Sequence, residues 1–189
     1  KFQVSALVTP ADFIEAADSN DVDIHDLYFE LRDYEGTKTC LMCHEEEGTQ
    51  MLDSAHFKWD GLSENMVGQE NEIHGKNDLI NNFCIAVPTN EGRCTQCHAG
   101  YGYKDATFDF TNPENVDCLI CHDNSGTYKK DPKLAGLPPA SVDLQAVARS
   151  VRQGSVPSRK NCIDCHAKAG GGDNVKHGDL STDLIATTR

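Results

Sequence analysis

Apolar residues recur at helical spacing in several short stretches of this 189-residue chain. The clearest stretch is 141–151, where they follow the three-to-four spacing of one helix face. These residues are Leu144, Val147, Ala148 and Val151. We expect this face to pack into a core. Alternation of apolar and polar residues, which is typical of strands, is weak throughout the chain. The pattern therefore predicts a chain that is mostly coil with short α-helices and little or no β-sheet.

The first 36 residues contain two further predicted helices. Thr9 is a favoured N-cap and Pro10 suits the first helical position, so a helix should run from Pro10 to about Asp18. The polar run 20–23 interrupts it before a second short helix over 25–31. Residues 1–8 are apolar enough for a short strand or an extended tail. We expect 1–36 to form an N-terminal arm and 37–189 a separate, larger domain.

A five-residue pattern, Cys-x-x-Cys-His, occurs four times in the larger domain. It is the attachment signature of c-type haem, because the two thiols can form thioethers with one porphyrin and the histidine then lies under its iron. The sequence therefore predicts four covalently bound haem c groups, wrapped by a chain with few elements of its own. The motif residues are Cys40, Cys43 and His44; Cys94, Cys97 and His98; Cys118, Cys121 and His122; and Cys162, Cys165 and His166.

Zinc is the alternative to haem for paired cysteines. A lone Cys-x-x-Cys is more often half of a zinc site or a redox dithiol, and four pairs would suffice for two four-cysteine zinc sites. Such sites do not require a histidine after each pair, and only eight of the 189 residues are histidines. Four chance histidines in those four positions have a probability of roughly a few in a million. The pattern strongly favours haem.

Four histidines lie outside the motifs, one for each predicted iron. This match predicts a second histidine ligand on every iron, although each residue alone is compatible with a surface or core position. These histidines are His25, His56, His74 and His177. Three methionines are rival ligands, but packing is the simpler role for Met51 and Met66, and Met42 lies inside a motif. The ninth cysteine, Cys84, is expected to be a small buried apolar residue.

The surroundings of these histidines differ along the chain. Thr49 is a candidate N-cap for a helix over 50–58 that would place His56 on an apolar face beside the aromatic Phe57 and Trp59. His25 lies on the arm, upstream of every motif, so it would either fold back or reach another subunit. The second and third motifs are joined by a short tether rich in glycine and aromatic residues, which favours near contact between their haems.

Composition and charge restrict the function. Hydrophobic residues make up 38% of the chain and aromatic residues 7%, so the porphyrins must supply much of the apolar interior and the haem-free chain should be largely unfolded. A net charge of −13 argues against nucleic acid or anionic membranes as partners. No apolar run reaches membrane-spanning length. No signal peptide is visible, and Lys1 has the character of a mature terminus. Haem c attachment follows export, so we expect an extracellular or cell-surface protein, with the periplasm as the alternative.

Residues outside the four motifs resemble a known family. From about Lys38 to Leu180 the chain resembles the first half of the octahaem tetrathionate reductases, and it is also similar to the tetrahaem extracellular cytochromes that polymerise into conductive filaments. The similar runs are 38–44, 54–56, 74–76, 79–84, 93–101, 115–123, 161–162 and 175–180. In the reductases the resemblance implies a catalytic haem near the second motif, with a displaceable lysine that follows the third motif. Lys129 or Lys130 would match that lysine, whereas His25 is an imidazole that those enzymes lack.

The leading hypothesis is therefore an electron carrier rather than an enzyme. We expect an extracellular subunit that polymerises end to end, with His25 of one copy binding an iron of its neighbour. It would receive electrons from upstream cytochromes and pass them to external metal or mineral acceptors. The alternatives are a soluble periplasmic shuttle and a small reductase that acts on tetrathionate, nitrite or hydroxylamine.

Overall fold

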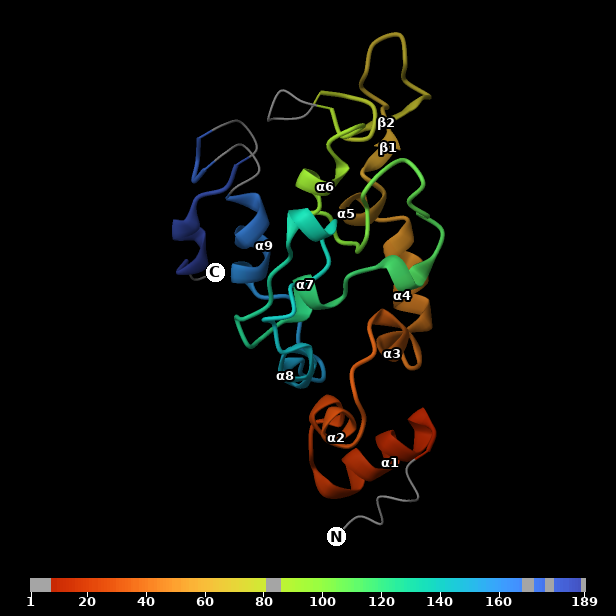
Figure 1. Cartoon of the computed structure of the whole chain (residues 1–189), viewed down its shortest axis with the longest axis vertical. Helices are drawn as coiled ribbons and strands as arrows, with labels where there is room; N and C mark the ends of the chain where they lie inside the picture. Colours follow the sequence, from red (N-terminus) through yellow and green to blue (C-terminus); the bar gives the residue numbers. More distant parts are fainter. Residues whose placement is uncertain (1–7, 81–85, 168–171, 176–178, 188–189) are drawn as a thin grey trace.

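The computed structural model describes residues 8–80, 86–167, 172–175 and 179–187. In this part of the chain short helices are joined by coil, and the two strands present form one small antiparallel sheet (Figure 1). This confirms the predicted fold class. The α-helices are α1 Pro10–Asn20, α2 Ile24–Leu31, α3 Thr37–Leu41, α4 Glu45–Leu52, α5 Ala55–Lys58, α6 Glu91–Cys94, α7 Leu119–His122, α8 Leu144–Ser150 and α9 Arg159–His166. Three 3-10 turns are η2 Pro113–Asn115, η3 Pro132–Leu134 and η4 Thr182–Ile185.

The helix α1 begins where the sequence predicts. Thr9 Oγ1 accepts a hydrogen bond from the Asp12 amide at 3.3 Å, and the Thr9 amide donates to Asp12 Oδ2 at 2.7 Å. This reciprocal pair is a capping box, which satisfies amides that the first helical turn leaves free. The helix ends at Asn20, two residues later than expected, with Asp21 in the left-handed conformation. The buried side chains of Phe13, Ala17 and Leu27 then join α1 to α2.

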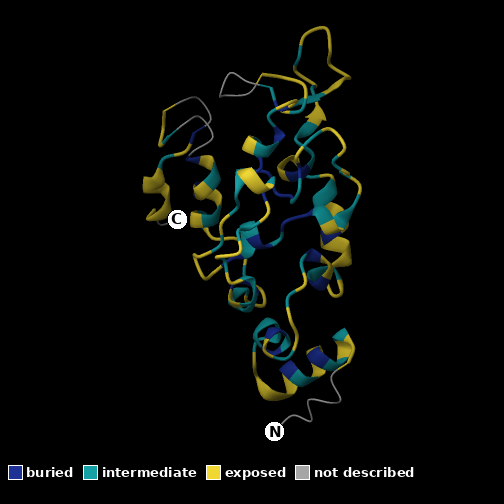
Figure 2. Cartoon of the chain, in the orientation of Figure 1, coloured by how far each residue is buried: buried dark blue, intermediate teal, exposed yellow. Residues whose placement is uncertain are grey.

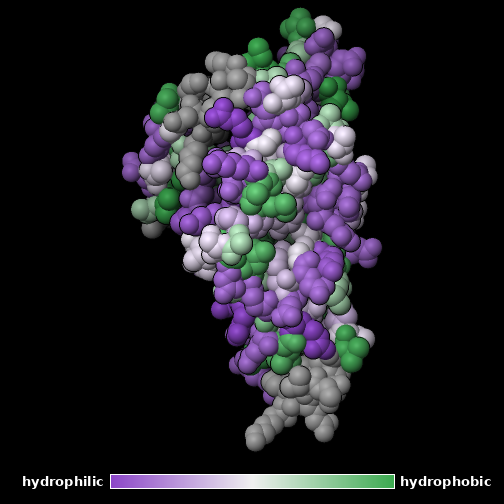
Figure 3. Space-filling model, in the orientation of Figure 1, coloured by the Kyte–Doolittle hydropathy of each residue, from purple (hydrophilic) through white to green (hydrophobic). Residues whose placement is uncertain are grey.

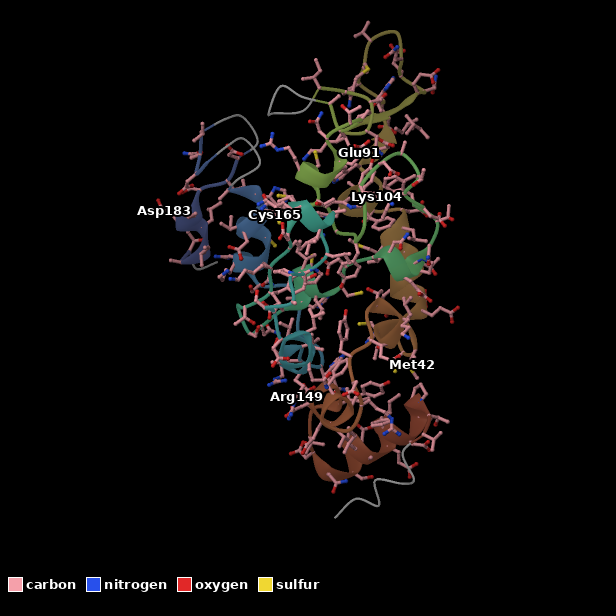
Figure 4. All side chains as sticks on the ribbon, in the orientation of Figure 1. Met42, Glu91, Lys104, Arg149, Cys165 and Asp183 are labelled. Carbon is pink, nitrogen blue, oxygen red and sulfur yellow. The ribbon has the colours of Figure 1, made fainter. Side chains whose placement is uncertain are left out.

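The N-terminal arm packs against the larger domain through α8 (Figure 1). Gln145 donates from its amide to the Phe29 carbonyl at 2.5 Å and accepts from the Tyr34 amide at 2.7 Å. Arg149, which is labelled in Figure 4, donates to Asp26 at 3.0 Å. The apolar face predicted for α8 is confirmed, since Val147 is completely buried. The arm is therefore docked onto α8 within this chain, which is one of the two arrangements that the sequence left open.

The helix predicted over 50–58 is instead two helices. The helix α4 starts earlier, at Glu45, because three glutamates in its first turn favour the positive end of a helix. Thr49 donates to the Glu45 carbonyl at 3.0 Å, so it lies within α4 and does not cap it. The chain then breaks at Ser54, whose hydroxyl accepts from the Phe57 amide at 3.3 Å and starts α5. Ser54 is thus the N-cap that the sequence analysis assigned to Thr49.

The small sheet forms a hairpin that projects at the end of the molecule opposite the N-terminus (Figure 1). Its strands are β1 Asp60–Leu62 and β2 Ile73–Gly75, paired so that Gly61 faces His74. A side chain at Gly75 would lie 1.9 Å from the Trp59 carbonyl, so the sheet requires glycine there. The absence of a side chain at Gly75 thus leaves room for the backbone at the start of β1.

Buried residues lie in the middle of the molecule and also in α1 and α2, as Figure 2 shows. The face drawn in Figure 3 is mostly hydrophilic, with scattered apolar residues. Within the described residues, no helix is long and apolar enough to cross a membrane.

Candidate haem centres

Each of the four motifs lies on a helical turn. The histidine amide donates to the carbonyl of the first cysteine at 3.0 Å in the first motif, 3.3 Å in the second and 3.1 Å in the third. The fourth motif lies within α9. Residues four apart on a helix share a face, so the first thiol and the imidazole point to the same side, as attachment to one porphyrin requires. None of the eight motif cysteines forms a disulfide, and no metal-binding group of three or more His, Cys, Asp or Glu residues occurs in the described part of the chain. Four-cysteine zinc sites therefore find no support there.

The arm places His25 opposite the histidine of the first motif. The ring centroids of His25 and His44 are 6.0 Å apart and their planes differ by 6°. Two imidazoles that share an iron, each about 2 Å from the metal, have centroids roughly 6 to 6.5 Å apart. Asp23 Oδ1 lies 3.6 Å from Nδ1 of His25, and Glu47 Oε2 lies 3.7 Å from Nδ1 of His44. Carboxylates that bond Nδ1 commonly orient metal-binding histidines. Here both distances exceed hydrogen-bond length, and Nδ1 of His25 is buried without a hydrogen-bond partner.

A second pair of histidines comes from opposite parts of the sequence. The rings of His56 on α5 and His166 on α9 have centroids 6.2 Å apart, with their planes at 87°. The distance again suits two ligands of one iron, and perpendicular imidazole planes are compatible with axial ligation, which fixes only the direction of each nitrogen. The separation of 110 residues gave no indication of this pairing in the sequence.

His74 on β2 has one nitrogen held and one without a partner. Its Nδ1 lies 2.5 Å from Asp78 Oδ2, and the same carboxyl group accepts from the Gly75 amide through Oδ1 at 2.9 Å. Its Nε2 is buried without a hydrogen-bond partner. A buried nitrogen with no partner is costly unless something absent from the chain binds it, so His74 fits the role of a metal ligand. The remaining spare histidine, His177, lies outside the described residues, as does Cys84.

The histidine of the second motif is enclosed by aromatic rings. His98 is completely buried, with its Nε2 2.6 Å from the Phe57 carbonyl and its Nδ1 unpartnered. Burial lowers the pKa of His98 to about 4, so its ring is neutral near pH 7 and retains the lone pair that a metal needs. Five aromatic rings have centroids between 4.4 and 6.0 Å from it: Phe57, Trp59, Tyr103, Phe108 and Phe110. The last three come from the tether between the second and third motifs.

Lys130 forms a buried ion pair in the centre of the molecule. Its side chain is 2% exposed, and its ammonium lies 3.2 Å from Oδ2 of Asp117, which is completely buried. The ammonium also donates to the His98 carbonyl and, at 2.7 Å, to the Gly100 carbonyl. Three oxygen acceptors match the three protons of an ammonium group. Tyr128 donates to the same Asp117 oxygen at 2.8 Å. Neither Asp117 nor Tyr128 was predicted from the sequence, because neither belongs to a recognised motif.

Two of the rival methionine ligands are engaged elsewhere. The Met42 sulfur lies 3.4 Å from the Tyr28 hydroxyl, and the Met51 sulfur lies 3.3 Å from the Ser54 hydroxyl. Both thioethers therefore accept hydrogen bonds within the chain, as the packing role predicts.

Residues of different motifs lie close to one another. Cys40 lies beside Cys118, which links the first motif to the third, and this neighbour raises the pKa of the Cys118 thiol. Cys97 lies beside Cys165, which links the second motif to the fourth. The third and fourth motifs adjoin through the packing of α7 on α9. The second and third motifs also adjoin, because the Asp117 amide, next to Cys118, donates to the Ala99 carbonyl, next to His98, at 2.9 Å. This contact agrees with the proximity that the short tether between them predicts.

Three comparisons place this geometry among known proteins. Residues 39–123 match the family model described as cytochrome c554 and c-prime. An uncharacterized protein of Archaeoglobus fulgidus is 27% identical over 198 residues, which cover 80% of this chain and 66% of that protein. The crystal structure of octaheme cytochrome c from Shewanella oneidensis is similar with a TM-score of 0.73 and 42% identity, over 87% of this chain and 36% of that one. This chain spans just under two thirds of the first relative and about a third of the second.

Proposed function

Since this chain has the fold and the attachment motifs of a multihaem c-type cytochrome, we propose that it transfers electrons through four haem c groups, each between two histidines. The facing rings of His25 and His44, 6.0 Å apart, are the observation that carries the proposal. An iron with imidazole on both faces has no open position for a substrate, so its chemistry is limited to gain and loss of an electron. The chain contributes the ligands, their orientation and the exclusion of water.

The structure suggests which histidine serves which motif. We assign His25 to the first motif and His56 to the fourth, because their rings lie beside His44 and His166. His74 suits the second motif, because the charge of Lys76, two residues after His74, acts on Cys94 of that motif. Asn77 also accepts a hydrogen bond at 3.2 Å from Tyr103, one of the rings around His98. His177 is then left for the third motif, with His122.

Within this chain the ring of His25 faces the ring of His44. The sequence-based hypothesis is that His25 reaches an iron of a neighbouring subunit, whereas the docked arm favours ligation inside the chain. Replacing His25 with Ala separates the two. Internal ligation predicts one high-spin haem with assembly unchanged, and ligation between subunits predicts loss of assembly as well. Visible absorption spectra together with sedimentation measure both properties.

The buried lysine favours a carrier over a reductase. A lysine that binds iron must be a neutral amine with a free lone pair, whereas Lys130 donates to three oxygens, one of them the Asp117 carboxylate. These contacts direct the Lys130 nitrogen toward oxygens of the chain and hold it away from ligation. A reductase of tetrathionate, nitrite or hydroxylamine would require an exchangeable ligand. The test is to add cyanide or nitrite to the reduced protein: a carrier shows no spectral change, and a ligand-exchangeable iron shows one.

We further propose that the protein is exported and works outside the cell as the repeating subunit of a filament. Haem c is attached after export, and the resemblance to filament-forming tetrahaem cytochromes supports the assembly. Haems at the four adjoining motifs would form a path within one subunit, which end-to-end contact would extend to the next. Upstream cytochromes would supply electrons, and external metal or mineral acceptors would receive them. Negative-stain imaging of the purified holoprotein distinguishes this from a periplasmic shuttle, which stays monomeric at high concentration.

A further inference from the structure

The first motif lies at an acidic and solvent-exposed surface. Cys43 is exposed, and the His44 side chain is 50% exposed. Three exposed glutamates follow directly and line an open hollow together with Cys43; they are Glu45, Glu46 and Glu47. A metal centre at this motif would therefore be close to water and to several negative charges.

The second motif has the opposite surroundings. His98 is completely buried within the five aromatic rings described above. The charges that act on Cys94 are two cations, Lys76 and Arg93, and one anion, Glu91. The nearby Lys130 charge is offset by Asp117. A metal centre here would be shielded from water and would have no excess of negative charge around it.

These differences act on the charge that an iron gains or loses. The oxidised centre has one more positive charge than the reduced centre, so water and carboxylates stabilise the oxidised form, and apolar burial penalises it. The first motif therefore favours a low reduction potential and the second a high one. Solvent exposure and charge both act in this direction at each motif.

The third motif lies between these two motifs. Cys40 of the first motif lies beside Cys118 of the third. The Asp117 amide, next to Cys118, donates at 2.9 Å to the Ala99 carbonyl, next to His98 of the second motif. A difference in potential between the first and second motifs would therefore act on an electron that passes through the third.

We propose that the chain has a built-in redox gradient, lowest at the first motif and highest at the second, which biases electrons to move from the first toward the second. The inference rests on the proposed electron-transfer function and adds a direction to it. At each transfer one electron leaves a ferrous centre, which becomes ferric, and reduces the next ferric centre. No bond is broken and no proton is needed.

The acidic end is tested by removing its charge. The double variant E45Q/E46Q of the holoprotein removes two exposed negative charges beside Cys43 and leaves Glu47 in place near His44. Removing two charges that lie about 10 Å from the metal in water should change the equilibrium constant of its reduction about fourfold. This change corresponds to a shift of about 35 mV in the reduction potential for one electron. Spectroelectrochemical titration should show the lowest-potential step moving upward by that amount. The matched control E64Q/E72Q removes two exposed charges from the hairpin and should leave that step unchanged.

The effect of burial at the second motif is tested by replacing one of the aromatic rings around His98. Phe108→Asn places a polar group 5.6 Å from the ring position of His98, and it should lower the highest-potential step. Phe108→Leu keeps the surface apolar and should change that step much less. If Phe108→Asn fails to fold, Phe110→Asn makes the same test.

Three results would overturn the gradient. The native protein could show four reduction steps at the same potential. The variant E45Q/E46Q could shift a step other than the one of lowest potential, or the hairpin control E64Q/E72Q could shift that step by the same amount. Each of these leaves electron transfer itself intact. The proposed function fails separately, if the centres do not reduce and reoxidise reversibly or if they bind added cyanide.

Discussion

At the scale of single residues, the hydrogen bond that one ring nitrogen of a histidine makes leaves the other nitrogen available to a metal. Asp78 binds Nδ1 of His74, and the buried Nε2 has no partner. At His25, Nδ1 is buried without a hydrogen-bond partner, and Asp23 lies 3.6 Å from it. The count of spare histidines predicted ligation, but it gave no pairing, because pairing depends on which helices pack together. The fold brings His25 to His44, although 18 other residues separate them in the sequence.

His25 gives the first prediction at this scale. Replacing His25 with Ala should convert one haem from low to high spin, because its iron loses one of two imidazoles. Asp26→Asn on the same helix, which weakens the contact with Arg149 but removes no ligand, should leave every haem low-spin. Visible and EPR spectra of the oxidised proteins make the comparison. A spectrum of the His25 variant identical to that of the native protein would remove His25 from the ligand set.

Lys130 gives the second prediction at this scale. Replacing Lys130 with Leu, a side chain that cannot bind iron, leaves the completely buried Asp117 carboxylate without its cation, which should lower the free energy of unfolding by about 3 to 5 kcal/mol. The double variant with Asp117→Asn should recover part of that loss, because no charge is then buried unpaired. Denaturant unfolding of the holoproteins measures both. Spin states should stay unchanged throughout, and a new high-spin haem in the Leu variant would instead identify Lys130 as an iron ligand.

At the scale of elements, the sequence predicted helices best where the local signals agreed. The helix α1 has an N-cap, a proline and an acidic third residue that all favour the same start, and it begins there. The prediction for 50–58 was wrong because Thr49 and Ser54 both suit an N-cap, and local chemistry alone does not choose between them. The docking of the arm was not predictable, since it depends on Gln145, a polar residue with no local signal of its partners.

Gln145 therefore gives the element-scale prediction. Gln145→Ala removes hydrogen bonds to the backbone of Phe29, Arg32 and Tyr34, and it leaves backbone groups of the arm unsatisfied at a cost of about 1 to 3 kcal/mol. The arm should then be cleaved faster in limited proteolysis than in the native protein. Gln153→Ala is the control, because Gln153 contacts Asp23 through its backbone amide, which the substitution keeps. Equal cleavage rates in both variants would show that Gln145 does not hold the arm.

At the scale of the whole molecule, the haem groups are expected to organise the chain. The sequence was sufficient to predict a fold of short helices, because it follows from local patterns, and the four attachment sites remain a prediction. The sequence did not predict which distant motifs adjoin, since that depends on how α7 packs on α9 and on which cysteines meet. The arrangement of Cys40 with Cys118 and of Cys97 with Cys165 is a property of the folded chain alone.

Removal of the haems is the prediction at this scale. A variant with all eight motif cysteines replaced by Ala should lose most of its helical signal in circular dichroism, because few apolar side chains remain to form a core. A variant that lacks the two cysteines of a single motif should retain more of that signal. A haem-free chain with native helix content and a cooperative unfolding transition would show that the protein folds without its cofactors.

The central claim is that four haems each lie between two histidines, so that the protein handles electrons alone. The most direct test is EPR spectroscopy of the oxidised holoprotein, with the spins counted against its haem content. Four low-spin ferric centres per chain and no high-spin signal are the predicted result. Fewer than four haems, or a high-spin iron in the assembled protein, would contradict the account.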